Sequence, residues 1–264
     1  MKELALVLGG GATKGFAHIG VLKVLEEHGI KPSIIVGTSM GAIVGGLYSA
    51  GVSADELINF AKSFNSKNVV DMSVINILTK GSVMRGKKLQ KYIYDILKDI
   101  THDELNIPFT AVACEMQTGK QINLDSGYVW KNVLASSAVP AVFPSVEIDG
   151  KILSDGGLVD NLPIDVAKAK NPKAVILSID VIGDYSKQVE VGGIKIVNQI
   201  LNMSTLYMSQ MVKIKNYKSD LNIKISQPSV KQMDFNHESA ESAVANGKRA
   251  MTRNIKQLIE LLKN

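Results

Sequence analysis

Cysteine, histidine and aromatic residues are scarce in this chain of 264 residues, and each scarcity excludes a class of site. Cys114 is the single cysteine, so no internal disulfide can form, which suits a reducing compartment. The cysteine and the four histidines show no metal-ligand spacing, so neither a metal nor another cofactor is expected. Nucleic acid is not an expected partner, because residues 213–264, the basic end of the chain, hold a single tyrosine and a single phenylalanine for base stacking.

Long hydrophobic runs are also lacking. The apolar stretch Leu4–Leu8 is too short for a secretory signal peptide before the glycines begin, so we predict a cytoplasmic location. The uncharged stretch Pro32–Ala54 is the candidate for a membrane span, with Gly37, Gly41 and Gly45 at four-residue spacing. It is rich in glycine and polar residues and begins with a short β-branched run, so a buried strand followed by a helix is the better interpretation.

Positive charge is concentrated near the C-terminus. The formal net charge is +5, and the basic end has ten Lys and Arg against five Asp and Glu. Peripheral contact with an anionic membrane surface is one interpretation, and a solvated helix face is the simpler one. Two Met-containing apolar stretches, residues 69–84 and 200–212, suit either lipid contact or the core, and we favour the core. The sequence leaves the oligomeric state open.

Short buried strands alternate with helical patterns, as expected of one α/β domain over residues 1–264. Two hairpins interrupt the alternation, and Asp149-Gly150 is the turn of the second. The last helix is predicted at about residues 238–262, with an apolar face that suits the core. The predicted strands are Leu4–Leu8, Ser33–Val36, Phe109–Cys114, Gln121–Leu124, Val146–Ile148, Lys151–Ser154 and Ala174–Asp180.

A glycine-rich stretch, LGGGATKGFAHIG at residues 8–20, follows the first strand. It has neither the Walker A ending nor the spacing of a dinucleotide fingerprint, so a nucleotide site is disfavoured. Its backbone N–H groups suit an anion or a developing oxyanion, although close packing of a strand on a helix would also need glycines. Lys14 lies near a helix N-terminus, where the dipole disfavours a cation by about 0.3–1 kcal/mol. It either bonds loop carbonyls, faces a substrate anion or is exposed.

Ser39 is the candidate nucleophile, at the centre of Gly37-Thr38-Ser39-Met40-Gly41. The Gly-x-Ser-x-Gly pattern is typical of a serine on a sharp turn between a strand and a helix. Such a hydroxyl needs a base to accept its proton. Asp155 ends a hairpin strand and precedes Gly156 and Gly157, two residues that let other backbone approach closely, although Asp-Gly-Gly alone is a common turn and does not identify the base.

Four motifs occur in order: the glycine-rich loop with its lysine, the Gly-x-Ser-x-Gly turn, Ser-Ala-x-Pro-x-x-Phe-Pro at residues 137–144, and Asp-Gly-Gly. Together they resemble the patatin-like phospholipase family, in particular its small bacterial members, from Leu4 to about Pro163. The resemblance implies a three-layer α/β/α fold with a mostly parallel sheet, a lipid or acyl-ester substrate, and a catalytic dyad of Ser39 and Asp155. It also implies an oxyanion hole formed by Gly10, Gly11 and their neighbours in the loop, which comprises Gly9, Gly10, Gly11, Ala12, Lys14 and Gly15. Ala12 stands where small bacterial members often carry a fourth glycine.

No histidine is expected to serve Ser39. His18 falls in the first helix, close to the glycine-rich loop, but a histidine before the nucleophile does not match the order of α/β-hydrolase triads. His28 is expected at the C-terminal end of that helix, and His102 and His237 fall in polar, loop-like stretches without glycines.

A regulatory adaptor on the same fold is the alternative function, with the dyad unused. The presence of both Ser39 and Asp155 argues against it. A carboxyl with the ordinary pKa of ~3.9 is a poor base at neutral pH, so we expect burial to raise the pKa of Asp155.

Overall fold

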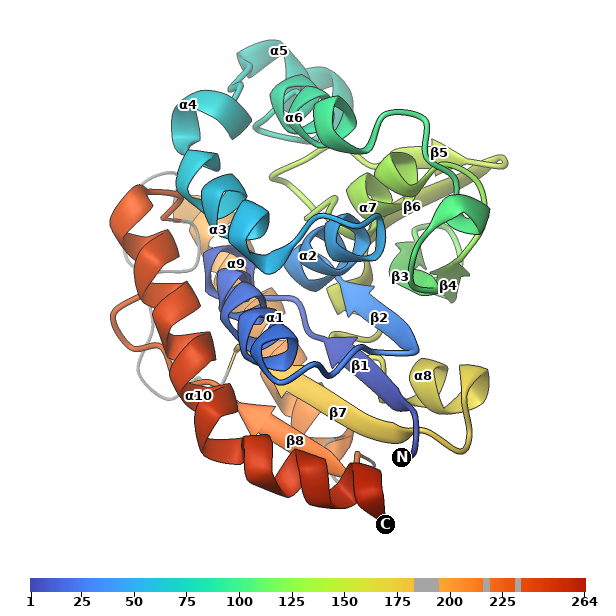
Figure 1. The fold of residues 1–264 in the computed structure, drawn as a ribbon. Coiled ribbons are helices and arrows are strands. Elements are labelled where there is room, and N and C mark those ends of the chain that lie inside the picture. Colours follow the sequence, from blue (N-terminus) through green and yellow to red (C-terminus); the bar gives the residue numbers. More distant parts are fainter. Residues whose placement is uncertain (183–194, 216–218, 231–233) are drawn as a thin grey trace.

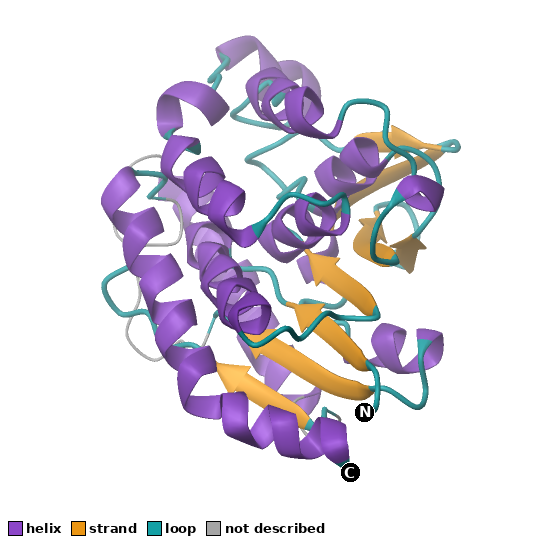
Figure 2. Cartoon of the chain, in the orientation of Figure 1, coloured by secondary structure: helices purple, strands orange, loops and turns teal. Residues whose placement is uncertain are grey.

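The computed structural model of the chain describes residues 1–182, 195–215, 219–230 and 234–264. Within these residues eight strands form one sheet (Figures 1 and 2). The strands are β1 (Leu4–Leu8), β2 (Ile34–Thr38), β3 (Phe109–Glu115), β4 (Gln121–Leu124), β5 (Val146–Ile148), β6 (Lys151–Asp155), β7 (Val175–Asp180) and β8 (Leu221–Lys224). The α-helices are α1 (Ala17–Glu27), α2 (Met40–Ser49), α3 (Ala54–Ser63), α4 (Ser66–Val69), α5 (Val74–Lys80), α6 (Lys87–Leu97), α7 (Val129–Ser136), α8 (Ile164–Lys170), α9 (Lys195–Lys215) and α10 (His237–Lys263). Short 3₁₀ helices are η1 (Ala12–Phe16), η2 (His102–Glu104) and η3 (Gly156–Leu158).

The seven strands predicted from the hydrophobic pattern are confirmed, with boundaries that differ by two residues or fewer. Parallel pairing joins β3, β2, β1, β7 and β8 in that order, while β4, β5 and β6 pair antiparallel. The parallel strands β1, β2, β3 and β7 are buried along their whole length, which explains why they appear in the sequence as continuous apolar runs. The predicted last helix is confirmed as α10.

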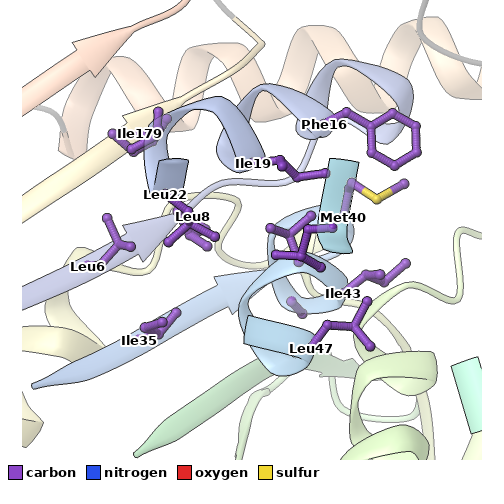
Figure 3. Close-up of a cluster of buried hydrophobic side chains, with 14 of the residues drawn as sticks. Leu6, Leu8, Phe16, Ile19, Leu22, Ile35, Met40, Ile43, Leu47 and Ile179 are labelled. Carbon is purple, nitrogen blue, oxygen red and sulfur yellow. The ribbon is translucent and has the colours of Figure 1, made fainter. Parts of the chain in front are cut away.

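Helices cover both faces of the sheet, so the predicted three-layer α/β/α architecture is confirmed. One face carries the larger core, in which Leu6, Leu8 and Ile35 of the sheet pack with α1, α2, α3 and α10. Figure 3 shows part of this core, where Ile19 and Leu22 of α1 lie near Leu8. The other face carries a smaller core, in which the alternate residues of the same strands pack against α8 and against Val212 of α9.

Helices α1 and α10 lie side by side along the larger core (Figure 1) because two glycines let their backbones meet. A Cβ added at Gly247 would overlap the carbonyl of Ala17, and one added at Gly20 would overlap the carbonyl of Val244. Both glycines are helical residues whose only advantage over alanine is the absent methyl group.

We expect Gly247→Ala to destabilise the protein although alanine is the better helix former. The methyl group forces α10 away from α1, and overpacking of this kind lowers the free energy of unfolding by about 1–3 kcal/mol. Urea unfolding followed by circular dichroism measures the change, with the exposed α10 variant Lys256→Ala as control. An unchanged or raised free energy of unfolding for Gly247→Ala would contradict this packing.

The uncharged stretch Pro32–Ala54 is confirmed as a strand followed by a helix, β2 and α2, both buried. The alternative of a membrane span there is wrong, because β2 pairs with β1 and β3 inside the sheet. Among the described helices, none combines the length and the apolar character needed to cross a bilayer.

The two Met-containing stretches are core only in part, because Val69 and Val212 are buried while other apolar residues of both stretches are exposed. Met72 and Ile75 are exposed near α5, and on α9 Met203, Leu206 and Tyr207 are exposed. The lysines and arginines of α10 are exposed, in agreement with a solvated helix face; they are Lys248, Arg249, Arg253, Lys256 and Lys263. Residues 216–218 and 231–233 of the basic end lie outside the described part of the chain.

Candidate active site

Ser39 occupies the turn between β2 and α2, with φ 54° and ψ −124°. This conformation is unfavourable for a side-chain-bearing residue, as in other strand-to-helix nucleophile turns. The flanking glycines are steric requirements: a Cβ at Gly41 would overlap the Leu8 carbonyl, and one at Gly37 would lie 2.6 Å from the Gly41 carbonyl oxygen. Gly37 and Gly41 therefore allow α2 to pack closely on the ends of β1 and β2.

Two serines that the sequence analysis did not assign to the site hold the backbone of Ser39. The Ser39 N–H donates to Ser136 Oγ at 3.0 Å, and Ser136 Oγ donates to the Val112 carbonyl at 2.6 Å. The Ser137 hydroxyl shares its hydrogen between the Val133 carbonyl at 2.8 Å and the Ser39 carbonyl at 3.2 Å. The available signal was the motif at residues 137–144, whose first serine is Ser137. These bonds fix the strained turn from the end of α7.

The pairing of β3 brings Asp155 next to Ser39. Strand β4 occupies one edge of β3, and the other edge is shared by β2, which ends with Thr38 opposite Val112, and β6, which ends with Asp155 opposite Ala113. The C-terminal ends of β2 and β6 therefore meet on one edge. Residues 116 positions apart in sequence thus become neighbours.

The carboxyl of Asp155 is buried beneath the nucleophile. Its Oδ1 accepts the Gly157 N–H at 2.8 Å, and Oδ2 has no hydrogen-bond partner of good geometry among the described residues. Burial raises the pKa of Asp155 to about 6, opposed to a smaller extent by the nearby Ser39 hydroxyl and the Gly157 N–H. The expected direction of this pKa shift is confirmed.

The glycine-rich loop offers fewer N–H donors than its sequence indicates. The Gly9 N–H donates to the Ile179 carbonyl at 3.1 Å, and the Gly10 N–H donates to the Asn161 carbonyl at 3.2 Å. The Gly9 N–H is therefore bonded to β7 and the Gly10 N–H to the segment after Asp155, so both already have acceptors. Ala12 follows with φ 46°, a left-handed conformation that glycine adopts without strain and that alanine adopts at a cost.

Lys14 and Gly15 lie in η1, between the loop and α1. The alternative of an exposed Lys14 is wrong, since its side chain is 5% exposed. The Lys14 carbonyl accepts from Gln227 Nε2 at 3.0 Å, and a Cβ at Gly15 would lie against the side chain of Met40. The loop is thus packed directly on the residue that follows the nucleophile.

The histidines bind groups other than Ser39. His18 is fully buried and donates from Nε2 to the Gly9 carbonyl at 2.7 Å, and burial lowers its pKa to about 4. His28 caps the end of α1, as expected. The expectation of loop-like positions is wrong for His102, which is buried in η2 and donates to the Phe109 carbonyl, and for His237, which begins α10 and pairs with Glu241. No cluster of three His, Cys, Asp or Glu side chains suited to a metal occurs in the described part of the chain.

An apolar cavity of about 30 Å³ opens beside Ser39. The enclosed part of the cavity is small, about the size of two water molecules. The lining residues come mainly from α2, from the end of α3 and from the loop after α7; they are Ala12, Ser39, Met40, Ile43, Phe64, Val69, Leu89, Ser137, Val139, Phe143 and Phe235.

The sequence is similar to known proteins of one family. The family model for patatin-like phospholipase matches residues 6–168. An uncharacterized NTE family protein of Mycobacterium tuberculosis is 38% identical over 162 residues, covering 61% of this chain and 44% of that protein. Human patatin-like phospholipase domain-containing protein 6 is 33% identical over 184 residues, 68% of this chain and 13% of that protein. Lysophospholipase NTE1 of Eremothecium gossypii is 33% identical over 182 residues, 68% of this chain and 12% of that protein. The matches thus span less than half the length of these relatives.

A solved structure supports the fold. VipD from Legionella pneumophila aligns with a TM-score of 0.55 at 13% sequence identity, over 97% of this chain and 67% of that chain. At this identity the likeness concerns the fold alone.

Proposed function

This chain belongs to the patatin-like phospholipase family, and from that membership we propose that it is a serine acyl hydrolase that cleaves lipid esters. The observation that supports the proposal most directly is the meeting of Ser39, on its strained turn, with the buried Asp155 carboxyl. Asp155 has the raised pKa that a general base needs, and a pKa of about 6 leaves the ionised form predominant at pH 7.

The proposed reaction has two halves. Ser39 Oγ attacks the ester carbonyl while its proton passes to Asp155, and the carbonyl oxygen becomes a tetrahedral oxyanion. Collapse of this intermediate breaks the ester bond, the alcohol leaves with the proton from Asp155, and the acyl group stays on Ser39. A water molecule then loses a proton to Asp155 and attacks the acyl carbonyl. Collapse of this second tetrahedral intermediate breaks the bond to Ser39 Oγ, the fatty acid leaves, and the proton on Asp155 returns to Ser39 Oγ.

Backbone amides are the proposed oxyanion donors. Because the Gly9 and Gly10 N–H groups already have backbone partners, the donors we propose are the N–H groups of Gly11 and Ala12, which follow in the same loop. Positioned amides in a water-poor site stabilise the transition state because no solvent has to reorganise around the developing charge.

The apolar lining of the cavity beside Ser39 supports an acyl-chain substrate. The name of the Eremothecium gossypii relative suggests lysophospholipids as one class to test. We propose that residues 1–264 work as one domain, because the described strands form a single sheet and α10 packs on α1. We also propose a cytoplasmic enzyme that meets lipid by peripheral contact through exposed apolar side chains such as Met203 and Leu206.

Labelling with a fluorophosphonate probe tests the proposed function. The folded protein should react stoichiometrically, with the label on Ser39 by peptide mass spectrometry, and should release fatty acid from phospholipid or lysophospholipid vesicles. A folded protein that takes no label and releases no fatty acid would instead favour the regulatory adaptor.

The pH profile provides an independent prediction. Because Asp155 must be ionised to accept a proton and its pKa is raised to about 6, kcat/KM should be constant above pH 7 and fall as pH drops through about 6. Initial rates on a short-chain ester between pH 4.5 and 8 measure this. In many enzymes a pH profile with its midpoint near 6 indicates a histidine. The exposed His237→Gln variant is therefore the control, and its pH profile of kcat/KM should match that of wild type. A flat profile down to pH 5 would contradict the assignment.

A further inference from the structure

We propose that Asn161 is a positioning residue that sets the geometry of the glycine-rich loop, and through it the direction of the oxyanion donors. The inference rests on the proposed function and extends it to a residue outside the dyad. Asn161 lies six residues after Asp155, in the loop between η3 and α8.

Asn161 binds both polar groups of Gly10. Its carbonyl accepts the Gly10 N–H at 3.2 Å, and its side-chain Nδ2 donates to the Gly10 carbonyl at 3.2 Å. Its side chain is 3% exposed, so water does not compete for these bonds. One residue therefore holds both the peptide group that enters Gly10 and the one that leaves it.

The side chain also fills the space between the two glycine motifs. A Cβ at Gly10 would lie 2.6 Å from Asn161 Oδ1, and a Cβ at Gly157 would lie 3.0 Å from the same atom. The Cβ at Gly10 would also lie 3.0 Å from the Cβ of Ser39. Asn161 thus lies where the nucleophile, the loop and the Asp-Gly-Gly turn converge.

This arrangement links the base to the oxyanion loop. Gly157 donates to Asp155 Oδ1, and Asn161 in the same segment fixes the carbonyl of Gly10, which is one half of the peptide group that carries the Gly11 N–H. A planar peptide transmits that orientation to the amide. Because oxyanion donors act only when aimed at the developing charge, a small rotation of this peptide reduces turnover without blocking substrate binding.

The Asn161 side chain makes one hydrogen bond among the described residues. Its Oδ1 is buried and has no partner there, so the bond from Nδ2 to the Gly10 carbonyl is the polar contact that the side chain supplies. Removing this donor leaves a buried carbonyl unpaired, which lowers the stability of the fold as well as disturbing the orientation of Gly10. Turnover of the folded variant, and not its stability, is therefore the readout that separates the two roles.

The test compares Asn161→Leu, which keeps the shape and removes the donor, with the matched control Asn132→Leu. Asn132 is also 3% exposed and donates from Nδ2 to the Ser126 carbonyl at 2.7 Å and to His102 Nε2 at 2.9 Å, in the middle of α7. On a short-chain ester, Asn161→Leu should lower kcat by about tenfold to a hundredfold with KM unchanged. Asn132→Leu should keep the wild-type kcat. Equal kcat values for wild type and Asn161→Leu would overturn the proposal.

Hydrogen–deuterium exchange gives a readout that does not depend on turnover. The peptide containing Gly10 and Gly11 should exchange faster in Asn161→Leu than in wild type or Asn132→Leu. If the wild-type protein has no ester activity, the proposed function fails, while hydrogen–deuterium exchange still tests whether Asn161 holds Gly10. An unchanged exchange rate in Asn161→Leu would overturn the positioning role of Asn161. Should Asn161→Leu not fold, Asn161→Ala removes the same donor with no added bulk and is measured in the same way.

Discussion

Replacing Ser39 with alanine is expected to reduce ester turnover by about a thousandfold or more, because it removes the only atom that forms the acyl-enzyme. The fold should not change. The bonds from Ser136 and Ser137 reach the Ser39 backbone and not its hydroxyl, and alanine tolerates φ 54° neither better nor worse than serine. The loss should therefore appear in kcat, with the melting temperature close to that of wild type.

Ser49 provides the matched control for this experiment. It is a buried serine at the end of α2, the helix that Ser39 precedes, and its Oγ has no hydrogen-bond partner among the described residues. Ser49→Ala makes the same chemical change nearly three turns away. It should keep full turnover and full fluorophosphonate labelling. Turnover of Ser39→Ala within about tenfold of wild type, or label retained by Ser39→Ala, would place the nucleophile elsewhere.

The sequence predicts those parts of the fold that depend on local pattern. Apolar runs predict β1, β2 and β7, and Asp149-Gly150 predicts the hairpin of β5 and β6, because neighbouring residues decide each of these. Ser39 is predictable for the same reason, since the glycines at 37 and 41 that permit its turn are its near neighbours in sequence. Asp155 could be selected as its partner only through the resemblance to a family.

The rest of the site depends on pairing between distant segments. Nothing near Asp155 in the sequence indicates that β6 continues the edge of β3 where β2 stops. The same holds for Asn161, which reaches Gly10 across 151 positions, and for the Gly9 and Gly10 amides, which distant carbonyls occupy. The exposed apolar face of α9 shows the same limit, because a helical pattern of Met and Leu predicts one buried face and does not say whether a partner element covers it.

The largest test of the dyad is Asp155→Asn, for which we expect turnover to fall by about a thousandfold or more. Asparagine keeps the shape of the side chain and an oxygen for the Gly157 N–H, but it cannot accept the Ser39 proton. The protein should remain folded. Burial raises the pKa of Asp155, so the ionised form is disfavoured in the folded state, and removing that charge at pH 7 should leave stability unchanged or higher.

The four histidine variants complete the test, each replaced by Gln and measured for kcat on the same ester at pH 7.5. A general base contributes about a hundredfold or more, so losses below about tenfold exclude a histidine from that role. His18→Gln is the most demanding case, because His18 holds the Gly9 carbonyl beside the loop and its removal disturbs the neighbouring amides. Even so, His18 has a pKa lowered to about 4 and its donor nitrogen is committed to Gly9, so neither its titration nor its geometry suits proton transfer from Ser39. A folded histidine variant that loses several orders of magnitude, beside an active Asp155→Asn, would overturn the dyad and replace it with a Ser–His pair.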